Sequence, residues 1–88
     1  MDATKFVFTA KHAIVKQWER NEVNVLGRDH ILPEDVFVVW QCKTLKNFKA
    51  VFGVYGSSNY YEFTWDGDEN RGYLDTYLKM RISVVEAD

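Results

Sequence analysis

The residues best suited to chemistry lie near position 68, where neighbouring side chains carry oxygen atoms that could bind a metal ion. Asp66, Asp68 and Asn70 occupy alternate positions, like the first three ligands of a calcium-binding loop. The match ends there, because Arg71 stands where that loop needs glycine and Tyr77 stands where it needs a bidentate glutamate. Without the last carboxylate, the oxygen shell around calcium is incomplete. We therefore predict a polar turn here, and neither a metal nor a cofactor for the chain.

The single cysteine, Cys42, could act as a nucleophile if His12 or His30 served as its base. It alternates with Trp40 along a β-type segment, so we expect a buried cysteine that behaves as a small hydrophobic residue. One cysteine and two histidines also lack the paired spacing of a zinc site. A lone cysteine excludes an internal disulfide and fits a reducing cytoplasm.

Further catalytic motifs are missing from the sequence. The stretch from Gly53 to Gly56 lacks the lysine and the helix start of a phosphate-binding loop. Ser57 does not stand in the strand–turn–helix context of a nucleophile elbow. No pair of carboxylates is set apart as general acid and base. We therefore predict that the protein is not an enzyme.

A basic stripe, formed by Lys5, His12, Lys16 and Arg20, runs along the predicted N-terminal helix. It could contact phosphates or an acidic protein, but Glu19 lies beside it and dilutes its charge. The whole chain has 11 Lys and Arg against 13 Asp and Glu, a net charge of −2. This balance argues against a nucleic-acid partner, which needs a basic footprint. We expect His12 and the stripe to be the solvated side of the helix.

The elements that position these residues fit one domain, residues 1–88. Hydrophobic residues make up 47% of the chain and aromatic residues 16%, which favours a compact core despite the small size. No apolar run approaches the ~20 residues of a membrane span, and the first five residues are not typical of a signal peptide.

The first two thirds of the chain divide into a helix and three strands. Apolar spacings of three and four predict a helix from Ala3 to Arg20, ended by Asn21. Its apolar stripe consists of Ala3, Val7, Ala10, Ile14 and Trp18. A connection to Asp35 follows. β-branched and aromatic residues with short connections then predict an antiparallel meander. Its strands are Val36–Lys43, Phe48–Tyr55 and Tyr60–Trp65.

The last element is predicted to be a second helix, from Asp68 to Glu86, because its apolar residues are spaced as on a helix. The alternative is a fourth strand through residues 82–85. The predicted fold is therefore α+β, in the order α-β-β-β-α. A three-stranded antiparallel sheet carries the N- and C-terminal helices on one face.

Strict alternation along the strands predicts two unlike faces of the sheet. The apolar face, covered by the helices, would carry Val36, Val38, Trp40, Cys42, Phe48, Ala50, Phe52, Val54, Tyr61, Phe63 and Trp65. The second face is mixed and has more apolar surface than a solvated face needs. It would carry Phe37, Val39, Gln41, Lys43, Lys49, Val51, Gly53, Tyr55, Tyr60, Glu62 and Thr64.

Two blocks of residues carry a family resemblance. The first comprises Asp35–Trp40, Cys42–Leu45, Asn47 and Lys49–Ala50, and the second comprises Tyr60–Glu62, Thr64, Gly67–Asp68 and Tyr73–Asp75. Together they resemble a family of small uncharacterised proteins of phages and prophages of Gram-positive bacteria, a domain of unknown function. The resemblance implies a bacterial host cytoplasm and a small accessory role, such as binding a host protein. It implies no catalytic residue.

These observations favour a protein that binds a protein partner, or closes a homodimer, through the open sheet face. The predicted contact residues are Phe37, Val39, Val51, Tyr55 and Tyr60, since tyrosine is enriched at interfaces. One alternative is an inhibitor of a host defence system such as a CRISPR nuclease, whose basic groove would meet an acidic patch. That patch would consist of Asp66, Asp68, Glu69 and Asp75.

A second alternative is a module that binds single-stranded nucleic acid. Bases would stack on Phe37, Tyr55 and Tyr60, and the basic stripe of the first helix would supply charge. The order α-β-β-β-α is also typical of double-stranded-RNA-binding domains, which contact phosphates through lysines that open their last helix. Asp68–Gly72 carries the opposite charge at that position, which argues against this class.

Overall fold

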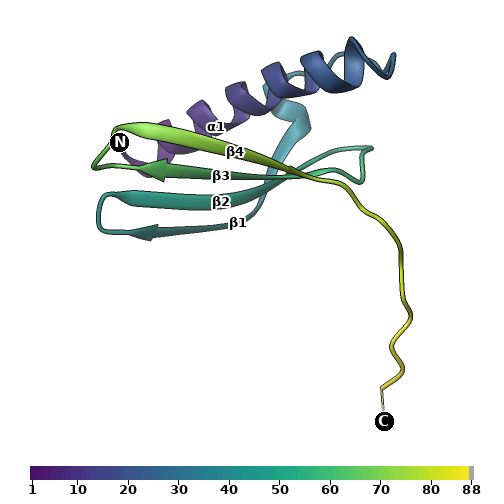
Figure 1. Ribbon diagram of the computed structural model, residues 1–88. Coiled ribbons are helices and arrows are strands. Elements are labelled where there is room, and N and C mark those ends of the chain that lie inside the picture. Colours follow the sequence, from purple (N-terminus) through teal and green to yellow (C-terminus); the bar gives the residue numbers. More distant parts are fainter. Residues whose placement is uncertain (88) are drawn as a thin grey trace.

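The computed structural model describes residues 1–87 and consists of one long helix packed on a four-stranded antiparallel sheet (Figure 1). The strands follow each other in the sheet in chain order, β1-β2-β3-β4. The helical elements are α1 (Ala3–Trp18), a π-helical turn η1 (Glu19–Val23) and a 3₁₀ turn η2 (Pro33–Asp35). The strands are β1 (Val36–Thr44), β2 (Asn47–Val54), β3 (Tyr60–Asp66) and β4 (Arg71–Tyr77).

Helix α1 begins where Asp2 caps it, since the Asp2 carboxylate accepts a hydrogen bond of 2.8 Å from the Lys5 amide. Its buried residues stand four apart, so they form one stripe along the helix. These residues are Phe6, Ala10, Ile14 and Trp18. The prediction that Asn21 ends the helix is wrong, because the helical path widens into η1 and continues to Val23.

The core lies between α1 and one face of the sheet. The Phe6 ring stacks on Phe48 with centroids 4.9 Å apart and also contacts Phe63 at 5.6 Å. The remaining buried sheet residues are Val36, Ala50, Phe52, Val54 and Tyr61. The three predicted strands and the α+β class are thus confirmed, and the apolar face is confirmed for β2 and β3.

The predicted C-terminal helix is wrong. The chain forms a fourth strand, β4, and residues 78–87 have no regular secondary structure. The alternative of a strand through residues 82–85 also misplaces the element. The sheet therefore has four strands, with one long helix on its face (Figure 1).

Pairing with β3 explains why a strand replaces the predicted helix. Seven residues of β4 pair with β3, from Arg71 opposite Asp66 to Tyr77 opposite Tyr60. The turn before β4 is held by the Asp66 carboxylate, which accepts backbone hydrogen bonds of 2.9 Å from Asp68 and 3.1 Å from Glu69. Asp66 thus shapes a hairpin, and the pairing with β3 outweighs the local helical periodicity.

Candidate functional site

A β-bulge in β1 decides which side chains reach the open face of the sheet. Val38 pairs with Phe52, but Trp40 pairs with Val51, so Val39 is an extra residue in the strand. Beyond the bulge the alternation is inverted. Trp40 and Cys42 therefore share the face of Val51 and Lys49, and both are exposed. The prediction that Trp40 and Cys42 lie in the core is wrong for this reason.

The same inversion moves Gln41 and Lys43 off the open face. They pair with Ala50 and Phe48, two core residues, and the Lys43 ammonium lies 5.4 Å from the centre of the Phe48 ring. The prediction that Gln41 and Lys43 belong to the open face is therefore also wrong.

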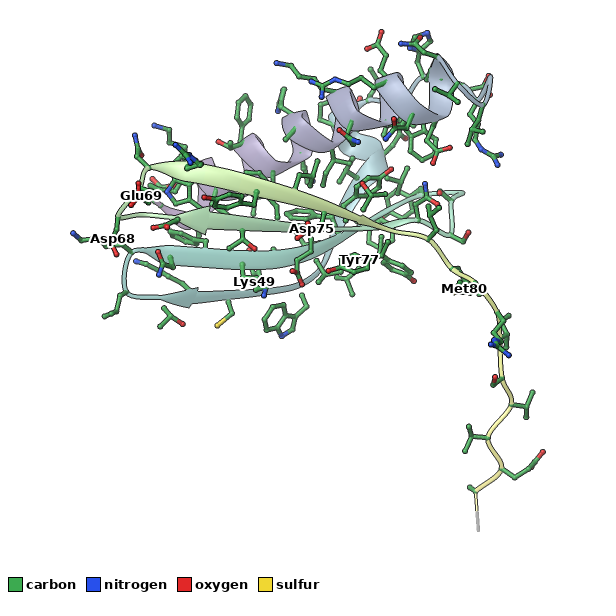
Figure 2. The ribbon with its side chains drawn as sticks, viewed as in Figure 1. Lys49, Asp68, Glu69, Asp75, Tyr77 and Met80 are labelled. Carbon is green, nitrogen blue, oxygen red and sulfur yellow. The ribbon has the colours of Figure 1, made fainter. Side chains whose placement is uncertain are left out.

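The sheet face that points away from α1, called here the outer face, is rich in exposed aromatic residues. Rows across the strands follow from the pairing register: Phe37–Gly53–Tyr60–Tyr77, Trp40–Val51–Glu62–Asp75 and Cys42–Lys49–Thr64–Tyr73. Figure 2 shows Lys49, Asp75 and Tyr77 on this side of the sheet. Five large aromatic side chains on this face are about half exposed or more: Trp40, Tyr55, Tyr60, Tyr73 and Tyr77.

One end of the outer face is built around Gly53. The Phe37 ring lies directly over this glycine, where any Cβ would collide with it. Phe37 also packs against Tyr55, with ring centroids 4.5 Å apart. Tyr55 itself is 66% exposed. The glycine thus makes room for the Phe37 ring at this end, next to Tyr60 in the adjacent strand.

Charged groups occupy the middle of the outer face. The Lys49 ammonium lies 3.5 Å from the Glu62 carboxylate. Glu62 also pairs in register with Asp75 of β4, which places two carboxylates side by side. Within residues 1–87, Asp75 forms no ion pair. The centre of this face therefore carries an acidic residue that has no ion-pair partner among the described residues.

Four of the five predicted contact residues come together on the outer face: Phe37, Val51, Tyr55 and Tyr60. Val39 stands apart from their rows as the extra residue of the bulge, where it is exposed. The sequence prediction missed three aromatic residues of this face: Trp40, Tyr73 and Tyr77. Alternation in Tyr73–Tyr77, with tyrosines at both ends and polar Asp75 between them, was the available sign of a strand.

The predicted acidic patch is not one patch. Asp66, Asp68 and Glu69 lie together in the β3–β4 turn, where Asp66 is engaged with backbone amides and Asp68 lies 3.9 Å from Lys46. Asp75 lies in the middle of β4, and Figure 2 shows it far along the sheet from Asp68 and Glu69.

Residues 1–87 hold no cluster of His, Cys, Asp and Glu that could bind a metal ion. Cys42 and His12 lie on opposite sides of the sheet, since His12 is exposed on α1 and its ring contacts Phe8. His30 precedes β1, whereas Cys42 stands near the far end of that strand. The predicted solvation of His12 is confirmed.

The basic stripe is separated from the outer-face aromatics. Lys5, Lys16 and Arg20 are exposed on α1, which covers the opposite face of the sheet (Figure 1). The structure therefore does not bring together the rings and the cations that the single-strand nucleic-acid alternative requires.

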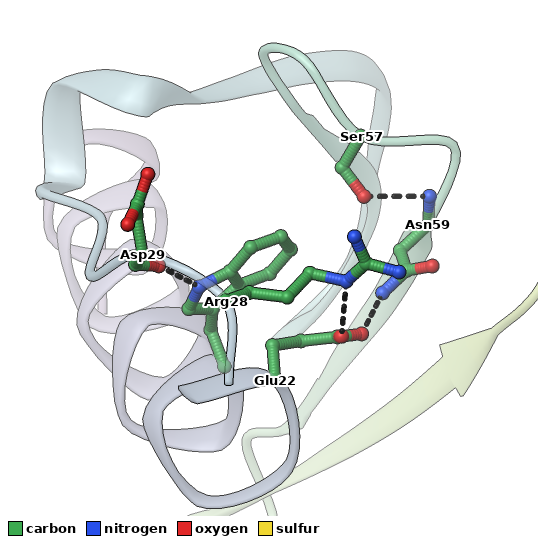
Figure 3. A network of polar contacts seen from close by, with 6 residues as sticks. Glu22, Arg28, Asp29, Ser57 and Asn59 are labelled. Atoms are coloured by element: carbon green, nitrogen blue, oxygen red, sulfur yellow. Dashed lines mark hydrogen bonds and ion pairs between the residues drawn. The ribbon is translucent and has the colours of Figure 1, made fainter. Parts of the chain in front are cut away.

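A buried polar network closes the core at the end of α1. Glu22 is only 6% exposed, and its carboxylate accepts a hydrogen bond from the Asn59 amide and pairs with Arg28 at 3.3 Å (Figure 3). The Trp18 indole N–H donates to the Asp29 carbonyl at 2.8 Å. These contacts tie the connection after α1 to the β2–β3 turn.

This network also touches a core tyrosine. Burial raises the pKa of the Tyr61 hydroxyl above its ordinary value of 10.0, and the Glu22 charge adds to the rise, whereas the hydrogen bond with Asn59 opposes it. An open hollow of about 710 Å³ lies beside the network. Glu22 and Asn59, which line it, are already engaged with each other, so we interpret the network as structural.

A comparison with models of known protein families finds a match over most of the chain. Residues 7–87 match the model of a family of unknown function, DUF6275. The chain belongs to this family. No curated protein and no solved structure matches the DUF6275 chain. No helix within residues 1–87 has the length and apolar character needed to cross a bilayer.

Proposed function

We propose that this DUF6275 protein is a small, non-enzymatic accessory protein that binds a protein partner through the outer face of its sheet. The observation that carries the proposal is the group of exposed rings on one side of a sheet whose other side is covered by α1. The exposed rings are those of Trp40, Tyr55, Tyr60, Tyr73 and Tyr77, and the half-buried Phe37 packs against Tyr55.

The residue types support a protein partner. Tyrosine and tryptophan dominate the energetic centres of protein interfaces, because they bury a large area at a small cost in side-chain entropy. Lys49, Glu62 and Asp75 add polar contacts that would orient a partner. The outer face thus combines apolar anchors with polar groups on a flat surface.

Two alternative functions have less support. Single-stranded nucleic acid needs cations beside the rings, and the exposed cations of α1 lie beyond the opposite face. An inhibitor acting through an acidic patch needs its carboxylates together, and Asp75 lies apart from the β3–β4 turn.

We further propose that the protein acts in the cytoplasm of a bacterial host as a product of a phage or prophage. The support for this is the resemblance of the blocks around Val36–Trp40 and Tyr60–Glu62 to small phage and prophage proteins. The partner would then be a bacterial protein, or a protein of the phage.

Affinity capture from a lysate of a Gram-positive bacterium tests this function. The bait would be the tagged protein, and the outer-face variant would be Tyr60→Asp combined with Val51→Lys. A matched control would carry Phe8→Asp and Lys16→Glu on the exposed side of α1. We expect a discrete protein that wild type and control retain and the outer-face variant loses, with or without nuclease.

Three results would contradict the proposal. Retention of the protein by the outer-face variant would exclude this face. Loss of the captured material after nuclease treatment would indicate nucleic acid instead. Capture only of untagged copies of the chain, lost in the outer-face variant, would indicate that the face closes a homodimer. Circular dichroism on each variant would establish that it is folded.

A further inference from the structure

The edge of β4 and the segment that follows it form a second unpartnered surface. β4 is the last strand of the sheet, so one of its edges has no neighbouring strand within residues 1–87. Residues 78–87 leave this strand and run away from the sheet (Figure 1). They expose an unusual amount of apolar surface: Leu78 67%, Met80 91%, Ile82 74%, Val84 82% and Val85 89%.

The order of residues in this segment is that of a strand with two unlike faces. Leu78, Met80, Ile82 and Val84 alternate with Lys79, Arg81 and Ser83. An exposed strand edge and an exposed strand-like segment in one chain are complementary, because each lacks the backbone partner that the other offers.

We propose that two copies of the chain pair through this segment, so that residues 79–85 of each copy form a fifth strand along β4 of the other. The pairing is antiparallel and symmetric, with the two copies of Leu78 opposite each other at the twofold axis. Tyr77 then stands opposite Lys79, Asp75 opposite Arg81, and Arg71 opposite Val85. This register covers the full length of β4.

The side chains on both faces agree with this register. On the α1 side, Ile82 would lie beside Leu74, a partly buried residue that packs against the core, and Met80 and Val84 would lie on either side of Ile82. On the outer face, Arg81 would meet Asp75, which stands next to Glu62 and has no ion pair within residues 1–87. This one register therefore gives Met80, Ile82 and Val84 strand neighbours. It also gives the Asp75 carboxylate a cationic partner, Arg81.

Folding back onto the same copy is disfavoured by the residues at the start of the segment. A hairpin after Tyr77 would need a tight turn at Leu78–Lys79, and neither residue is a turn former. That hairpin would also set Met80 opposite Tyr77, which shifts the apolar residues to the other face and separates Arg81 from Asp75. The second copy is therefore the occupant that fits.

Charge-reversal variants test the register, with the dissociation constant of the dimer measured by sedimentation. Arg81→Asp would place two acidic residues opposite each other twice per dimer, and we expect the dissociation constant to rise at least about tenfold. Asp75→Arg should weaken the dimer similarly. The double variant, Arg81→Asp with Asp75→Arg, should recover wild-type affinity.

A disulfide test locates the twofold axis. In a Cys42→Ser background, Leu78→Cys would bring two thiols to directly opposed positions, at a spacing that a disulfide spans. Val85→Cys is the matched control, because it is more exposed but would lie far from its copy in this register. We expect rapid cross-linking of the first variant alone.

Three results would overturn the dimer. The wild type could sediment as a monomer at all concentrations, the double charge reversal could fail to rescue, or Val85→Cys could cross-link as fast as Leu78→Cys. A dimer weakened by Tyr60→Asp with Val51→Lys but not by Arg81→Asp would place the contact on the outer face and equally overturn the register. The first three outcomes leave capture of a foreign protein by the outer face untouched, so the two proposals can fail separately.

Discussion

Tyr60 and Tyr61 are neighbours in β3, yet they belong to opposite faces of the sheet with different roles. Tyr61 is 1% exposed beneath α1, whereas Tyr60 is 47% exposed on the outer face. Both are the same residue type in the same strand, so the difference is one of position. The comparison teaches that large rings stabilise the fold on one face of this sheet and remain available for binding on the other.

The largest expected effect comes from truncating these two residues. Tyr61→Ala removes a fully buried ring and should lower the free energy of unfolding by about 3–5 kcal/mol. Tyr60→Ala should lower it by less than about 1 kcal/mol, because about half of Tyr60 is already exposed to solvent in the folded state. Urea unfolding followed by tryptophan fluorescence measures both. Equal losses would contradict the division of roles between the faces.

A second prediction concerns the covered side of the sheet, where the polar network at the end of α1 should contribute to stability. Glu22→Ala leaves the Asn59 amide without its carboxylate partner and should cost about 1–3 kcal/mol of stability. Arg28→Ala should cost much less, because the Arg28 side chain is 63% exposed. A double-mutant cycle with Asn59→Ala would isolate the coupling. Additive effects would show that the network contributes nothing as a unit.

A third prediction concerns the β1–β2 turn at one end of the sheet. Leu45 adopts a φ of 57°, which is unfavourable for a leucine, and its side chain is 87% exposed. Leu45→Gly should therefore raise stability by about 0.5–1 kcal/mol, the strain relieved less the entropy lost. Lys46→Gly is the control, since Lys46 has no positive φ. A thermal melt would refute the explanation if both variants lost stability equally.

The smallest expected effect is a dependence on alkaline pH. The pKa of Tyr61 is raised in the folded state, so its contribution to stability is complete below the unfolded pKa near 10.0 and is lost as pH rises above it. Tyr61→Phe should therefore flatten the stability profile above pH 10 relative to the wild type. Unfolding measured at several alkaline pH values checks this, and identical profiles for Tyr61→Phe and the wild type would contradict it.

Local pattern was sufficient for the helix and the first three strands. Spacings of three and four identified Ala10, Ile14 and Trp18 as core residues, although they missed the buried Phe6 and included the exposed Ala3. β-branched runs identified β1 to β3. The β4 segment failed because Leu74, Leu78 and Ile82 have a helical spacing that only pairing with β3 overrides. The strand can be assigned only from its pairing with β3, which the spacing of apolar residues within this segment does not reveal.

The residues of the outer face were only partly predicted from the sequence, because alternation fails where a strand is irregular or is not recognised. Phe37, Val51, Tyr55 and Tyr60 lie on the outer face as alternation predicts, because β2 and β3 are regular and Phe37 precedes the bulge in β1. Trp40 was assigned to the wrong face, since the continuous apolar run Val36–Trp40 hides the bulge that inverts the alternation. Tyr73 and Tyr77 were missed with β4 itself.

The central claim is that the outer face, and not the exposed side of α1, contacts a protein. Site-specific photocross-linking tests it most directly, with a photoreactive phenylalanine in place of Tyr60 or, as the control, in place of Phe8, which is 61% exposed on α1. In a bacterial lysate, the account predicts a discrete protein adduct from position 60 and none from position 8. An adduct from position 8 alone, or from neither position, would contradict it.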